Sequence, residues 1–157
     1  MSDLIVQGSD LAISTQGRGF YILDNISPIR QWSDAVASAP EAWLFAPSAA
    51  IRSTTGASVT YWLKHPAKNV TMEFLDSAGA VIRKYAPDSA RAPAADTAAG
   101  GGRGRGGFTV APPVIAGVNN VNWDLRYTSA VSFPGLSLWG WGRTGPSGAP
   151  GTYKVGL

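Results

Sequence analysis

Short apolar runs separated by glycine-containing turns dominate the beginning of the chain, and this spacing restricts what it can fold into. The runs are residues 4–6, 11–15 and 20–23, with Gly8 and Gly17 between them. Glycine accepts the positive φ angles that tight hairpin turns require. The pattern therefore predicts consecutive antiparallel strands that form an incomplete meander.

The same kind of signal returns in the middle of the chain. Residues 58–63, 70–75 and 80–85 read as strands, and turn residues separate them at 65–69 and 76–79. Apolar and polar residues alternate within 70–75, which indicates a strand with one buried face. An antiparallel sheet with one face toward a core is expected here.

Two further strands are expected near the C-terminus, over residues 119–127 and 151–157. Alternation along the first of them favours Trp123 as a core anchor. Tyr153 follows a Pro-Gly turn, where a tyrosine packs its ring and bonds its hydroxyl group to the backbone. Both residues are interpreted as structural.

The segments between these strand groups have a different composition. Ser27 is expected to cap a brief helix whose first position is Pro28. Residues 33–47 combine alanines and prolines, which predicts an irregular connector leading to a strand. Residues 86–107 hold little besides Ala, Pro, Gly and Arg, which is typical of a flexible surface loop.

Composition excludes several classes of function. The formal charge is +3, from 13 basic and 10 acidic residues that are scattered along the chain, so no nucleic-acid partner is expected. Arg103 and Arg105 lie in a glycine run that is similar to single-strand RNA-binding segments, but one short copy favours a linker. No stretch of about 18 apolar residues exists to span a membrane, so no membrane partner is expected either.

Catalytic chemistry has few candidates. Cysteine is absent, and His65 is the only histidine, beside a proline in an expected turn. A histidine-based triad, a thiolate metal site and a cysteine nucleophile are therefore not expected. Asp124 and Arg126 lie two residues apart on one expected strand, where an ion pair is the interpretation. The sequence predicts no catalytic residue, no metal and no cofactor.

The run DLAISTQGRGFYILDN, residues 10–25, and the following residues 29–31 resemble the last propeller strands of bacterial BNR or Asp-box repeat proteins. These proteins are akin to sortilin-type propellers and are often labelled glycosyl hydrolases. Gln16 departs from the family, which commonly has a histidine there. Residues 76–83, 117–127 and 150–155 are similar to the immunoglobulin-like sandwich that follows such propellers.

The resemblance implies an all-β chain with an immunoglobulin-like or fibronectin type III-like sandwich. It divides the chain into propeller-type strands (1–32), a connector (33–56) and the sandwich (57–157), the last interrupted by the loop at 86–107. The implied function is that of a non-catalytic accessory module, whose partner is the propeller domain of a parent protein. The implied location is extracellular or periplasmic, with any export signal upstream.

Two alternatives come from other functional classes. A carbohydrate-binding module would stack sugar rings on exposed tryptophans, and the chain has six. The candidates for that role are Trp139, Trp141 and Trp62. A small glycoside hydrolase would need two carboxylates about 5–10 Å apart across a cleft. The candidates for that role are Asp124, Glu73 and Asp24.

A final expectation concerns self-association. The first strands form an incomplete sheet, and open strand edges pair readily with another chain. We therefore expect the isolated chain to associate with copies of itself.

Overall fold

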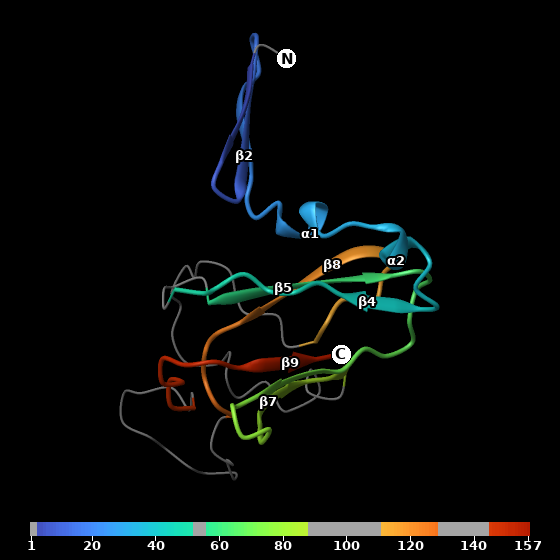
Figure 1. The fold of residues 1–157 in the computed structure, drawn as a ribbon, viewed down its shortest axis with the longest axis vertical. Helices are drawn as coiled ribbons and strands as arrows, with labels where there is room; N and C mark the ends of the chain where they lie inside the picture. Colours follow the sequence, from blue (N-terminus) through green and yellow to red (C-terminus); the bar gives the residue numbers. More distant parts are fainter. Residues whose placement is uncertain (1–2, 52–55, 88–110, 129–144) are drawn as a thin grey trace, which may run out of the picture.

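The computed structural model describes residues 3–51, 56–87, 111–128 and 145–157 (Figure 1). Within these ranges the chain is mostly β, and its strands form three antiparallel sheets of three strands each. The expectation of an all-β chain is confirmed for this part of the molecule. The expected loop at 86–107 lies almost entirely outside the described residues.

Sheet A is a meander at the N-terminal end. It consists of β1 (Asp3–Gln7), β2 (Asp10–Thr15) and β3 (Gly19–Leu23), in that order. The turns between the strands use Gly8 at φ 61° and Gly17 at φ 86°, which explains why the glycine spacing located them. Figure 1 shows that sheet A projects away from the rest of the molecule.

Two helices of one turn each follow sheet A. Helix α1 (Ser27–Arg30) begins one residue earlier than expected, so that Pro28 lies at its second position, and the side-chain oxygen of Asn25 accepts the N–H of Ser27 at 3.2 Å. The cap expected from Ser27 is therefore wrong: Ile26 is the N-cap residue, and no side chain caps the helix. Helix α2 (Asp34–Ala37) was not expected within the irregular connector. A single turn is too short to produce a recognisable helical period.

Sheet B is built from β4 (Ala42–Leu44), β5 (Ala57–Leu63) and β8 (Gly117–Trp123), with β5 in the centre. The strand expected through residue 127 ends earlier. Its continuation is interrupted because Leu125 adopts φ 58°, a conformation that extended strands do not use.

Sheet C contains β6 (Met72–Leu75), β7 (Val81–Tyr85) and β9 (Lys154–Gly156), with β6 in the centre. The buried face expected for the 70–75 segment is confirmed, since Met72 and Phe74 are buried, whereas Glu73 and Leu75, which alternate with them, are half-buried.

The hydrophobic core lies between sheets B and C, which form a β-sandwich-like pair (Figure 1). Its side chains come from both sheets and from the approach to β6. They are Val59, Tyr61, Leu63, Val70, Met72, Phe74, Ile82, Tyr85, Val121 and Trp123. Trp123 stacks on Phe74 at 4.7 Å between ring centroids, and both are at most 3% exposed. The expectation that Trp123 anchors the core is confirmed.

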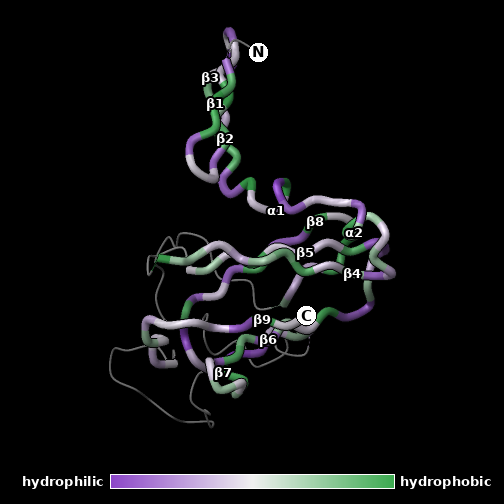
Figure 2. Tube along the Cα trace, in the orientation of Figure 1, coloured by the Kyte–Doolittle hydropathy of each residue, from purple (hydrophilic) through white to green (hydrophobic). Residues whose placement is uncertain are grey.

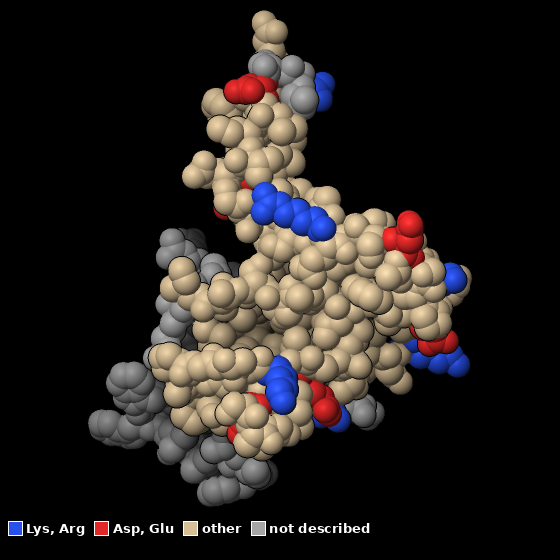
Figure 3. All heavy atoms as spheres, in the orientation of Figure 1, with Lys and Arg blue, Asp and Glu red and all other residues tan. Residues whose placement is uncertain are grey.

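Figure 2 shows apolar segments in sheet A as well as in the two sheets that form the core. On the face drawn in Figure 3, basic and acidic side chains lie scattered among uncharged ones. Neither α1 nor α2 is long enough to cross a membrane, and no other helix is found in the described residues.

Candidate functional site

Sheet A carries the largest set of exposed apolar side chains in the described chain, and its strand register distributes them over two faces. Residues paired across neighbouring strands point to the same face. On the first face, the register aligns two rows of apolar residues, and the pair Thr15 and Gly19 lies at the end of the face. The apolar residues are Leu4, Val6, Leu11, Ile13, Tyr21 and Leu23. We call this surface face 1.

The opposite surface, face 2, is apolar in its centre. The register aligns Ile5, Ala12 and Ile22 in one row, and Phe20 extends the apolar area beside Ser14. The exposed fraction is 83% for Phe20, 68% for Ile22 and 57% for Ile5. A sheet that is solvated on one side alternates apolar and polar residues, whereas a sheet covered on both sides does not. Sheet A therefore has the composition of a sheet with two covered faces.

The sequence contained a signal for this arrangement that the strand assignment alone did not use. Residues 4–6 and 20–23 are unbroken apolar runs, and such runs are typical of strands buried on both faces. Turn spacing predicts where the strands lie. Only the absence of apolar-polar alternation within them predicts that both faces of sheet A need to be covered. These runs are candidate site residues that turn spacing alone does not reveal.

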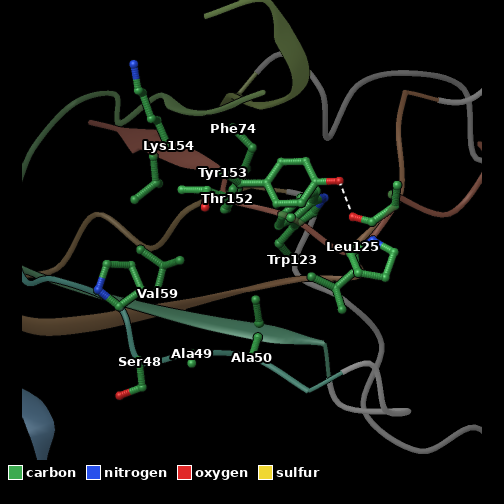
Figure 4. Close-up of a pocket in the computed structure, with 17 residues that line it drawn as sticks. Ser48, Ala49, Ala50, Val59, Phe74, Trp123, Leu125, Thr152, Tyr153 and Lys154 are labelled. Carbon is green, nitrogen blue, oxygen red and sulfur yellow. Dashed lines mark hydrogen bonds between the residues drawn. The ribbon is translucent and has the colours of Figure 1, made fainter. Parts of the chain in front are cut away.

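A second feature is a cavity of about 720 Å³ at one side of the sandwich, between the segment 47–50 and the residues leading into β9 (Figure 4). Figure 4 shows Tyr153 and Thr152 on one side, with Ala49 and Ala50 on the other. The hydroxyl group of Tyr153 donates a hydrogen bond to the Ala149 carbonyl at 2.5 Å, as expected for this residue.

The chemistry of this cavity is limited. Its described lining is mainly apolar and includes Val59, Phe74 and Trp123 from the core. The ionisable residues among its described lining are Tyr153 and Lys154, and Figure 4 shows the Lys154 amino group directed away from the other lining residues. Glycoside hydrolysis needs a pair of carboxylates, and none of the described lining residues is acidic.

The three carboxylates considered for hydrolysis lie on different elements. Glu73 on β6 forms an ion pair with Lys84 at 2.8 Å. Asp124 follows β8 and accepts the backbone N–H of Arg126 at 3.1 Å, while Asp24 is exposed at the end of β3. Among the described residues, no group of three or more acidic or histidine side chains is placed to hold a metal ion.

The ion pair expected between Asp124 and Arg126 is wrong. The guanidinium group of Arg126 donates instead to the Gly145 carbonyl at 3.0 Å. The reason is the positive φ of Leu125, which ends the strand before these two side chains can share a face. His65 is exposed in a turn, as expected.

Two of the tryptophans proposed as a sugar platform, Trp139 and Trp141, lie outside the described residues. Trp62 is half-buried in β5, paired in register with Trp43. The ring of Trp32 meets that of Trp62 edge to face at 6.0 Å, so part of Trp62 is covered by another aromatic side chain. Trp32 is the more exposed of the two.

Two buried tyrosines have shifted ionisation. Burial raises the pKa of Tyr61 to about 12, and its hydroxyl group donates to the Pro113 carbonyl. Burial also raises the pKa of Tyr85, and the neighbouring Asp124 carboxylate adds to the effect while Arg83 opposes it. Both tyrosines belong to the core between sheets B and C, so these shifts report packing.

Comparison with known proteins adds no relative to this description. The chain matches no family model, no curated protein and no solved structure.

Proposed function

We propose that this chain is a non-catalytic accessory module that docks on a β-propeller through sheet A. In this proposal, sheets B and C form an immunoglobulin-like or fibronectin type III-like sandwich, and the parent protein is exported to the periplasm or the cell exterior. The observation that carries the proposal is the exposure of apolar residues on both faces of sheet A.

A propeller is the partner that fits this surface best. Its blades are small antiparallel sheets arranged radially, so each blade is covered on both faces by its neighbours. Sheet A is a small antiparallel meander with two apolar faces, and its outer strands β1 and β3 each have one edge without a partner strand in the described chain. The resemblance of residues 10–25 to terminal propeller strands supports the same partner.

The arrangement of ionisable residues supports an accessory role. The described carboxylates of Glu73, Asp76 and Asp124 are engaged in an ion pair or in turns. These contacts hold neighbouring strands and turns together, and none requires a substrate.

The proposal is tested by binding of the purified chain to a BNR-type propeller domain from the same genome, measured by calorimetry. We expect a complex with the wild-type chain and none with Ile22→Asp, because the charge would be buried in the interface. Val81→Asp is the matched control, since Val81 is also an exposed strand residue, at 52%, but lies on sheet C. Equal loss with both variants, or no binding by the wild type, contradicts the proposal.

Affinity electrophoresis on soluble polysaccharides separates this proposal from the carbohydrate-binding alternative. We expect unretarded migration. Retardation that is abolished by Trp139→Ala and Trp141→Ala would assign the chain to carbohydrate binding instead.

A further inference from the structure

The turn between β1 and β2, at the base of sheet A, is hydrogen-bonded to the segment that follows β3. The backbone N–H of Ile26 donates to the Ser9 carbonyl at 2.6 Å. The N–H of Asn25 donates to the Asp10 carboxylate at 3.0 Å, and the Arg30 guanidinium donates to the Gly8 carbonyl at 3.0 Å. These bonds join sheet A to helix α1.

Gln31, the C-cap residue of helix α1, connects this helix to the sandwich through side-chain hydrogen bonds. The side-chain amide of Gln31 donates to the Ala46 carbonyl at 3.0 Å and accepts the Ala46 N–H at 2.8 Å. It thereby pairs with both backbone groups of one residue, as a neighbouring strand does in an antiparallel ladder. Ala46 directly follows Phe45, whose own N–H bonds to β5.

Two further contacts lie beside this pairing. The hydroxyl groups of Ser27 and Ser48 are 3.0 Å apart. The ring of Trp32 lies 6.2 Å from that of buried Phe45 in a stacked arrangement, and its edge-to-face contact with Trp62 reaches sheet B. A sequence of short contacts therefore runs from the base of sheet A to the centre of sheet B.

We infer that Gln31 is a positioning residue that fixes the angle of sheet A on the sandwich through its paired hydrogen bonds to Ala46. A two-point hydrogen bond restrains rotation as well as distance, which a single bond does not. The contacts of Arg30 and Asn25 transmit this restraint to sheet A. The role of this restraint in binding rests on the proposed function, because a fixed angle presents sheet A to its partner already oriented.

The fixed angle also shapes a small pocket of about 290 Å³ between the two parts of the molecule. Leu23 from β3, Trp32 and Val118 from β8 are among the residues that line it. Because its walls come from sheets A and B, this pocket keeps its shape only while the angle is held.

The test measures the distance between spin labels on Arg18→Cys and Lys68→Cys by pulsed electron spin resonance. Arg18 lies in the turn at the far end of sheet A, and Lys68 lies in an exposed turn of the sandwich. The chain has no cysteine of its own, so both labels are placed uniquely. We expect one narrow distance distribution in the otherwise unchanged chain and a broad one after Gln31→Ala.

Two variants control this experiment. Gln31→Glu keeps an acceptor for the Ala46 N–H but loses the donor, so an intermediate width is expected. Gln16→Ala removes the same type of side chain from the turn at the tip of sheet A and should leave the distribution narrow. A broad distribution before Gln31 is changed, or an unchanged one after Gln31→Ala, overturns the inference.

Binding to the propeller domain provides a second readout. We expect Gln31→Ala to weaken affinity about tenfold, because sheet A must then lose its freedom of orientation on binding, and Gln31→Glu to recover part of the affinity. Unchanged affinity with a broadened distribution overturns the role in binding. If the wild-type chain forms no complex although its distribution is narrow, the proposed function fails and the positioning by Gln31 stands.

Discussion

Sheet A and the paired sheets B and C are built from similar strands, but they differ in where their apolar side chains lie. In sheets B and C, alternation directs one face of each strand toward the core, where Trp123 and Phe74 are almost completely buried. In sheet A the apolar residues lie on both faces, and those of β1 and β3 are exposed while those of β2 are half-buried. The difference teaches that strand content alone does not separate a folding core from an exposed apolar sheet, whereas the distribution of apolar residues over two faces does.

The largest effect should come from removing a core ring. Trp123→Ala should lower the free energy of unfolding by about 3–5 kcal/mol, because it leaves a cavity beside Phe74. Phe20→Ala, in sheet A, should change it by less than about 0.5 kcal/mol, since Phe20 is mostly exposed. Denaturant unfolding followed by circular dichroism measures both. Similar losses for the two variants would remove the distinction between the sheets.

Self-association should depend on sheet A and not on the sandwich. Without the propeller, we expect copies of the chain to associate, because covering exposed apolar side chains is favourable. Ile5→Lys should shift the population to monomer by placing a charge in the centre of face 2. Sedimentation velocity over a range of concentrations measures this shift. A wild-type chain that stays monomeric at high concentration contradicts the expectation.

The response to high pH should come from the sandwich. The pKa of Tyr61 is about 12 in the folded chain, against 10.0 ordinarily, so the folded state holds this proton more tightly than the unfolded state. The free energy of unfolding should therefore fall as pH rises from 10 toward 12, with full stability from this group below pH 10. Tyr61→Phe should make that fall smaller, as measured by denaturant unfolding across the same range. If the free energy of unfolding of the variant falls equally steeply, groups other than Tyr61 cause the pH dependence.

The smallest effect is expected at the surface of sheet C. Lys84→Ala removes the ion pair with Glu73, whose side chains are both substantially exposed. Solvent screens such pairs, so the free energy of unfolding should change by no more than about 0.5 kcal/mol. Thermal unfolding at low and high salt measures it. A larger loss would mean that the ion pair contributes more to the sandwich than exposed pairs do.

Much of the sheet structure was predictable because its signals are local. Glycine positions located the turns of sheet A, and alternation in 70–75 identified a buried face. The early end of β8 was not predictable, because Leu125 adopts a positive φ that its side chain disfavours. Tertiary contacts impose such a conformation, and the residue type does not reveal it.

The candidate site was predictable in part. The unbroken apolar runs of sheet A are visible in the sequence, and they indicate that both faces need cover. The pairing of Gln31 with Ala46 was not visible, because it joins residues 15 positions apart through a side chain without any sequence pattern. Its detection required the positions of helix α1 and of the segment that follows β4.

The central claim is that a propeller covers sheet A, and photo-crosslinking tests it most directly. Benzoylphenylalanine replaces Phe20 in one sample and Val81 in another, because both residues are exposed but only Phe20 lies on sheet A. With the propeller domain present, the account predicts crosslinks to the propeller from position 20 and none from position 81. Crosslinks from position 81 alone, or from neither position while a complex forms, would contradict it.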